Sequence, residues 1–357
     1  MVTHSELEEL TPVELALATR NHGLPLEALR YDVTPIGLHY LLIHFDIPYV
    51  DESSWKLDIG GHVRSPISLS LSELRERPRI TLACTFECAG NSRARLSPRP
   101  ISQPWLEEAV GTAEWTGTSL GPLLEEAQVD DGALEVLFTG LDRGIQGEVE
   151  QSYERSLPLD EARRPEVILA YEVNGQPLPP QHGFPLRLVV PGWYGMTAVK
   201  WLDRVTVLTE PFEGYQQAEQ YMNRQSEDDP GVPVTRMLPR SLLIPPGIPD
   251  FPERRRFMRP GSVQLEGRAW SGLGPIVRVE VSMDGGQTWD DAALGEAVGE
   301  FGWAAWTYDW DDVQAGEYEL CSRATDAAGN VQPVDPAWNF HGYSVNSVQR
   351  VPLTVAD

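Results

Sequence analysis

Cysteine is scarce in this sequence: Cys84, Cys88 and Cys321 are the only three in 357 residues. So few cysteines exclude a disulfide framework and fit a reducing compartment. The sequence also lacks an apolar run of membrane-spanning length. Its start, MVTHSELEEL, has neither the basic residues nor the apolar stretch of an export signal. We therefore expect a cytoplasmic protein that makes no membrane contact.

Basic residues are also few, with 28 Lys and Arg against 53 Asp and Glu and a formal net charge of −25. A field of this sign repels phosphate backbones, so nucleic acid is excluded as a partner. It favours a cationic partner protein. An anionic substrate would need Arg, Lys or His residues to reverse the field inside a pocket.

Several common catalytic motifs are missing. The sequence contains no P-loop, no dinucleotide-binding glycine fingerprint and no Ser-His-Asp order. It also contains no CxxCH motif, so we expect no haem.

What is abundant favours strands and loops. The sequence has 31 Gly, 30 Pro and 11 Trp, and its length exceeds what one hydrophobic core usually serves. We expect an α+β first domain over residues 1–228 and a Pro-rich connecting segment over 229–260, where proline blocks regular elements. Short strands with regularly spaced turns predict an immunoglobulin-like β-sandwich over 261–357.

Local patterns predict the elements of the first domain. Apolar stretches favour strands at 39–50, 55–63, 80–90 and 133–140, and Ser or Thr before apolar-periodic runs favours short helices at 69–77 and 118–127. In the second domain, SMDGGQTW (282–289) predicts a hairpin turn. The run Arg254 to Arg256 is typical of a solvated face.

Cys84 and Cys88 lie four residues apart. On a strand this separation is about 13 Å, which exceeds the roughly 7 Å Cα limit for a disulfide. Cys88 stands where the strand gives way to a turn containing Gly90, and such a turn can hold a side chain at a pocket. Cys88 is therefore the candidate functional residue, whereas Cys84 and Cys321 fit small buried residues.

Two segments, ECAGNSRA (87–94) and YEVNGQPLPPQHGFPLRLVVPGWYGMTAVKWLDRVTV (171–207), resemble the sulfite oxidase family of molybdenum enzymes. The resemblance extends from about Tyr40 through the C-terminal sandwich. It implies a mixed α/β fold that holds one molybdopterin cofactor. It also implies an immunoglobulin-like domain that carries a dimer contact, and hence a homodimer.

The resemblance also implies roles for single residues. Cys88 would ligate molybdenum as a thiolate, a soft and strongly donating ligand. The implied cofactor contacts are Tyr40, His44, Asp142, His182, Arg187 and Lys200. The implied catalytic residues are Arg93, Trp105, Tyr221 and His341, together with Cys88. Structural alternatives stay open, because Arg187 and Lys200 also fit solvated strand positions and Tyr221 fits a surface tyrosine.

Three positions depart from the family. Leu42 and His341 stand where the family has substrate-binding arginines, and Ser92 replaces a basic residue. Loss of two guanidinium groups should weaken binding of an anion. A protonated His341 would restore part of the charge as the pH falls.

The implied reaction is oxygen-atom transfer, with sulfite oxidised to sulfate and electrons passed to an external acceptor such as a cytochrome. The substrate would be a small oxyanion or oxide. Two alternatives remain: reduction of a sulfoxide, an N-oxide or nitrate on the same cofactor, and a non-catalytic relative of the fold.

Overall fold

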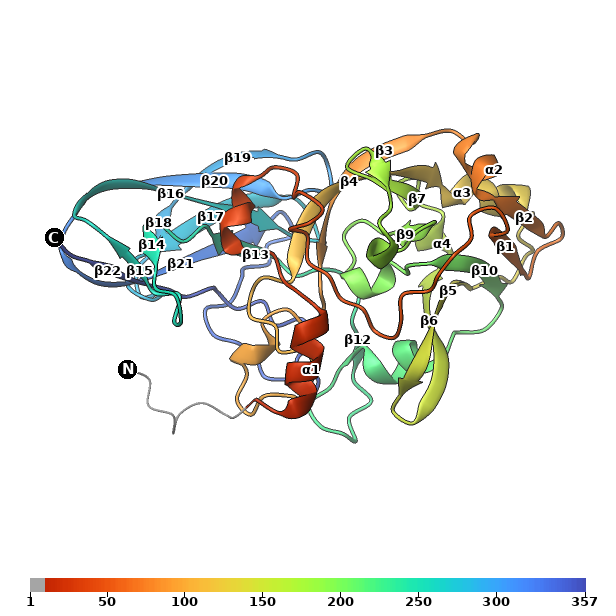
Figure 1. The fold of residues 1–357 in the computed structure, drawn as a ribbon, viewed down its shortest axis with the longest axis horizontal. Coiled ribbons are helices and arrows are strands. Elements are labelled where there is room, and N and C mark those ends of the chain that lie inside the picture. Colours follow the sequence, from red (N-terminus) through yellow and green to blue (C-terminus); the bar gives the residue numbers. More distant parts are fainter. Residues whose placement is uncertain (1–9) are drawn as a thin grey trace.

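The chain forms two bodies of strands that lie side by side (Figure 1), in a computed structural model that describes residues 10–357. Helices are few and short. The four α-helices of the described residues are α1 (Pro12–Arg20), α2 (Leu71–Arg75), α3 (Leu120–Glu126) and α4 (Leu159–Ala162). The expectation of a strand-rich protein is confirmed. No helix of these residues is long and apolar enough to cross a membrane.

Two sheets build the first body. One has the order β2-β1-β10-β5-β6, and only its β1·β10 pair is parallel. These strands are β1 (Lys56–Gly61), β2 (Ile67–Ser70), β5 (Glu135–Gln146), β6 (Val149–Pro158) and β10 (Leu202–Leu208). The other has the order β3-β4-β7-β8, with β9 beside β7. Its strands are β3 (Ile80–Glu87), β4 (Val110–Ser119), β7 (Ile168–Val173), β8 (Gln176–Pro177) and β9 (Arg187–Val189).

Local sequence explains the short helices. The hydroxyl of Ser70 accepts a hydrogen bond from the Glu73 N–H, and the Glu73 carboxylate accepts one from the Ser70 N–H. This reciprocal capping begins α2 within the predicted range 69–77. The helix predicted at 118–127 forms as α3.

The strand predicted at 39–50 is wrong. The backbone there forms only an isolated bridge, between His22 and Leu41. Consecutive side chains from His39 to Leu42, and then His44, line one cavity, so the segment has no strand-like alternation of faces. The apolar pattern therefore identified a partly buried segment but not its backbone conformation.

A sandwich of two sheets forms the second body. One sheet contains β13 (Arg240–Leu243), β16 (Gly261–Trp270), β20 (Ala304–Val313) and β19 (Ala293–Ala297). The other contains β14 (Ile248–Pro249), β15 (Arg256–Met258), β22 (Val351–Val355), β21 (Gly316–Asp326), β17 (Ile276–Ser282) and β18 (Asp290–Asp291). Residues of both sheets, among them Leu243, Trp306 and Leu353, share one core. A further pair, β11 (Met222–Asn223) and β12 (Val232–Pro233), lies outside both sheets.

Two expectations for the second half need correction. The Pro-rich segment does form regular elements, because β13, β14 and β15 lie within it and join the sandwich sheets. The run Arg254 to Arg256 is not wholly solvated, since the Arg256 side chain is buried and pairs with Glu27. The predicted turn at 282–289 is confirmed, and the Asp284 carboxylate accepts hydrogen bonds from the N–H groups of Gln287 and Thr288.

Candidate functional site

A small cavity, with a volume of about 60 Å³, opens beside the end of β3. Its wall includes eight of the residues that the sequence singled out, and it combines segments that are far apart in the chain. The eight are Tyr40, His44, Cys88, Asp142, His182, Arg187, Lys200 and Tyr221. Leu42 lines it as well.

Cys88 follows β3 directly, and its backbone is fixed on both sides. Its N–H donates to the carbonyl of Ala109 (2.9 Å), and its carbonyl accepts from the Asn91 N–H (3.0 Å). The side chain packs against Trp105 and Ala109. Burial raises the pKa of the Cys88 thiol, whereas the nearby Arg93 lowers it. All three cysteines are free.

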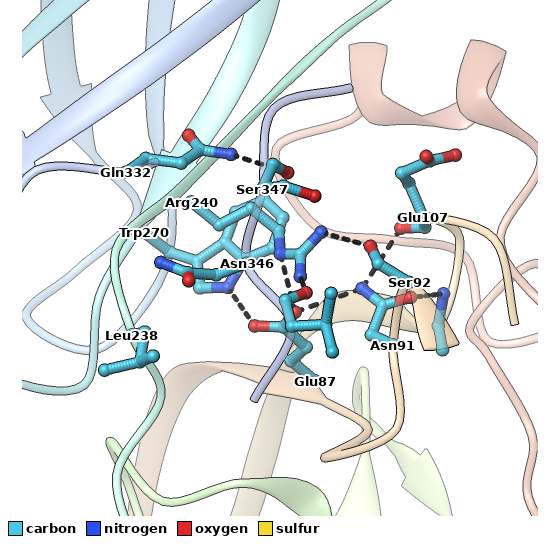
Figure 2. A network of polar contacts seen from close by, with 12 residues as sticks. Glu87, Asn91, Ser92, Glu107, Leu238, Arg240, Trp270, Gln332, Asn346 and Ser347 are labelled. Carbon is cyan, nitrogen blue, oxygen red and sulfur yellow. Dashed lines mark hydrogen bonds and ion pairs between the residues drawn. The ribbon is translucent and has the colours of Figure 1, made fainter. Parts of the chain in front are cut away.

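A network of buried polar groups holds the Cys88 loop against the sandwich (Figure 2). The Glu87 carboxylate pairs with Arg240 Nε at 2.7 Å and accepts hydrogen bonds from Trp270 Nε1 (2.9 Å) and Asn91 Nδ2 (3.0 Å). Arg240 also donates to Ser92 Oγ at 2.8 Å. Since Arg240 and Trp270 belong to β13 and β16, the second body anchors residues on both sides of Cys88.

Arg187 and Lys200 do not lie on a solvated face. Arg187 donates to the carbonyls of His182 (3.1 Å) and Ala198 (3.3 Å), and its guanidinium carbon lies 4.6 Å from the centre of the Trp115 ring. Lys200 Nζ donates to the carbonyls of Leu42 (2.9 Å) and Gln181 (3.1 Å). Burial lowers the pKa of Lys200 to about 7, and burial raises that of Asp142 to about 7. The solvated alternative for both basic residues is therefore wrong.

Tyr221 is also not a surface residue. It is 4% exposed, and its hydroxyl lies 2.7 Å from His44 Nε2. Burial raises the pKa of the phenol well above its ordinary value, so the hydroxyl stays protonated at neutral pH. Burial lowers the pKa of His44 to about 3, so its ring is neutral. The pair can therefore present one proton at the cavity wall.

Three predicted residues lie outside the cavity wall. Trp105 packs behind Cys88. Arg93 donates from Nε to the backbone carbonyl of His341 (2.8 Å), and its guanidinium lies over the Tyr343 ring. The His341 ring is 5.7 Å from that of Tyr343. Burial and the charges of Arg224 and Arg93 lower the pKa of His341, so any gain of charge there needs a lower pH than an ordinary histidine does.

Sequence reasoning missed His39, Tyr153 and Met196 in the wall. Tyr153 donates from its hydroxyl to the Met196 carbonyl (2.7 Å) and packs its ring against His44. The alternation of β6 placed Tyr153 on a buried face, which was the available signal. For His39, the sequence contained no signal other than its position next to Tyr40.

Three buried histidines should make the fold sensitive to acid. Burial lowers the pKa of His39 to about 4, of His44 to about 3 and of His182 to about 2. The unfolded chain takes up these protons below about pH 6.5 while the folded chain does not, so stability is present above that pH and is lost as the pH falls.

We expect the free energy of unfolding, measured by urea titration at pH 7.5, 6.5 and 5.5, to fall across this window. His182→Asn should reduce the slope, because one proton uptake is removed. An equal slope in His182→Asn and the wild type would contradict the assignment to buried histidines.

The side chains of the cavity wall suit a polar, anionic cofactor better than a bare metal ion. No three His, Cys, Asp or Glu side chains within residues 10–357 are grouped to hold a metal. Cys88 would thus be a single protein ligand. Several buried polar atoms here have no partner in the described chain, namely His39 Nε2, Asp142 Oδ1 and Arg187 Nε. Buried polar groups are normally hydrogen-bonded, so these atoms suit a ligand with donors, acceptors and negative charge.

Comparisons with known proteins agree with this fold. Residues 44–216 match the family model of the oxidoreductase molybdopterin binding domain, and residues 252–356 match that of the Mo-co oxidoreductase dimerisation domain. The chain is similar to the mitochondrial sulfite oxidase of Homo sapiens, with 36% identity over 346 residues, 91% of this chain and 62% of the human one. It is 33% identical to the sulfite oxidase of Arabidopsis thaliana over 358 residues, covering 90% and 88% of the two chains.

A solved structure gives the same picture. The sulfane dehydrogenase SoxCD from Paracoccus pantotrophus superposes with a TM-score of 0.80 and 26% identity, covering 100% of this chain and 95% of that one. Fold and site together define a molybdopterin-binding oxidoreductase with a dimerisation domain. The chain belongs to the sulfite oxidase family. It spans about 62% of the length of the human relative.

Proposed function

We propose that this protein oxidises sulfite to sulfate at a molybdenum cofactor. The observation that carries the proposal is the meeting of Cys88, the Tyr221–His44 pair and the basic side chains of Arg187 and Lys200 in one buried cavity. Relatives named sulfite oxidase over nine-tenths of the chain support the choice of substrate.

The residues of the cavity would have distinct roles. Cys88 would hold the metal as a thiolate, and the cofactor supplies two-electron oxygen-atom transfer when it is bound. His182, Arg187 and Lys200 would hold the cofactor's anionic and polar groups, with Tyr40, His44 and Asp142 beside them. Tyr221 would donate its hydroxyl proton in a hydrogen bond to an oxygen atom of the substrate. Arg93, Trp105 and His341 would pack behind Cys88 and Tyr221 and support them from outside the cavity wall.

Steady-state assays on one preparation test this proposal. Ferricyanide reduction driven by sulfite should exceed background, whereas reduction of dimethyl sulfoxide, trimethylamine N-oxide or nitrate by a reduced dye should be weak. The reverse ranking would support the alternative, which the apolar Leu42 in the cavity wall favours. A loaded cofactor with no turnover of any of these compounds would point to a non-catalytic relative.

Tyr221→Phe should lower kcat for sulfite by about 10 to 100-fold, the effect of losing one buried hydrogen bond to the reacting group. His44 Nε2 also loses its partner in this variant. Tyr318→Phe in the sandwich removes a comparable hydroxyl, which donates to the Gln314 carbonyl at 3.0 Å, and serves as the control. An unchanged kcat in Tyr221→Phe would remove Tyr221 from the mechanism.

The proposal also covers the oligomeric state, the electron acceptor and the location of the enzyme. We infer a homodimer through the second domain, since that domain matches a dimerisation model. Electrons would leave to an external acceptor such as a cytochrome, for which the net charge of −25 suits a cationic partner. A cytoplasmic location and the α+β class of the first domain belong to the same proposal.

A further inference from the structure

The buried arginines of residues 10–357 fall into two groups. Arg240, Arg256 and Arg268 each pair with a carboxylate, of Glu87, Glu27 and Asp32 respectively. The other three, Arg93, Arg155 and Arg187, donate to backbone carbonyls and form no ion pair with a carboxylate of the described residues. A buried cation without a counter-charge is costly, and natural proteins keep it where a ligand supplies the charge.

These three arginines lie in or near the wall of the same cavity. Arg187 lines the cavity that contains Cys88. The guanidinium carbon of Arg155 lies 5.3 Å from the centre of the Tyr221 ring, and that of Arg93 lies 4.9 Å from the centre of the Tyr343 ring. The two rings are 5.0 Å apart. At the Tyr221 side of the cavity, the contacts therefore run in order from the Arg155 guanidinium through the rings of Tyr221 and Tyr343 to the Arg93 guanidinium.

Arg155 makes few other polar contacts. It lies on β6 with 1% of its surface exposed, and Nη1 donates to the carbonyl of Gln216. Its Nε has no partner in the part of the chain that the structure describes. The ionisable groups that act on its charge are the tyrosines at 153, 221 and 343, none of which carries a negative charge at neutral pH.

We propose that Arg155 is a positioning residue which, through Tyr221 and together with Arg93, makes the cavity selective for a small oxyanion. The inference rests on the proposed function and narrows its substrate class. It also explains how the site can bind an anion with Leu42 and His341 at positions where the resemblance implies arginine. Arg155 on β6 supplies the positive potential that those two positions lack. A neutral sulfoxide or N-oxide would gain little from such a potential.

The test compares Arg155→Met with Arg143→Met, an exposed arginine of the adjoining strand that pairs with Glu150. Sulfate is the probe, titrated calorimetrically into the cofactor-loaded proteins. In Arg155→Met we expect the sulfate Kd and the sulfite KM each to rise about tenfold or more, with a smaller change in kcat. Arg155→Lys should recover part of the affinity, since it keeps the charge. Arg143→Met should match the wild type.

Thermal unfolding separates this role from a structural one. Since Arg155→Met removes a buried cation that lacks a counter-charge, its Tm in sulfate-free buffer should be no lower than that of the wild type. A lower Tm with unchanged sulfate Kd and sulfite KM would overturn the inference and leave sulfite oxidation intact. Arginine-dependent sulfate binding in a wild type that does not oxidise sulfite would instead overturn the proposed reaction and leave the inference standing.

Discussion

Cys88→Ser should abolish sulfite oxidation, with turnover reduced more than about a hundredfold and molybdenum content falling with it. Cys88 is the only thiol of the cavity wall, and its thiolate is a much stronger donor than the thioether of Met196 there. A serine hydroxyl is smaller, harder and not deprotonated at neutral pH. The measurement is molybdenum per chain and ferricyanide reduction, made on the same preparation.

Cys84→Ser is the matched control, because Cys84 is also buried and free and lies four residues earlier. It lies outside the cavity wall and packs against Phe86 and Trp115. Its variant should retain metal and turnover, with only a loss of stability. Equal turnover in Cys88→Ser and the wild type would refute the assignment of the metal ligand.

Arg240→Met should cost about 3–5 kcal/mol of unfolding free energy. Its guanidinium pairs with Glu87, both side chains are 1% exposed, and the variant leaves that carboxylate buried without its cation. The double variant Glu87→Gln with Arg240→Met removes both charges and should recover much of the loss. Urea titration monitored by tryptophan fluorescence measures both.

The same pair should matter beyond stability, because Glu87 precedes Cys88 and Arg240 also binds Ser92. In the double variant, stability returns but the loop loses its fixed attachment to the sandwich, so turnover should stay low. Arg64→Met, at an exposed ion pair with Asp130, is the control and should cost less than about 1 kcal/mol. Full activity in the double variant would show that the network is only structural.

The candidate site was largely readable from the sequence, because motif residues carry their chemistry with them. The segment around Cys88 and the segment 171–207 pointed to Cys88, His182, Arg187 and Lys200, and these four line one cavity with the predicted residues Tyr40, His44, Asp142 and Tyr221. What the sequence could not give was the environment of each. Arg187 and Lys200 looked equally suited to a solvated strand until burial decided between the alternatives.

Contacts between distant residues explain the rest. Arg155 and Tyr221 lie 66 positions apart, and Glu87 and Trp270 lie 183 apart, so no local pattern announces either pair. The segment 39–50 failed for a related reason. Its side chains are partly buried around the cavity and not in a sheet, so their burial needs no strand.

The most direct test of the account is the molybdenum content of the purified protein, expressed in a host that makes the cofactor, together with its sulfite-dependent reduction of ferricyanide. The account predicts about one molybdenum per chain and turnover that saturates with sulfite. Protein that folds fully in such a host but contains no molybdenum would contradict it.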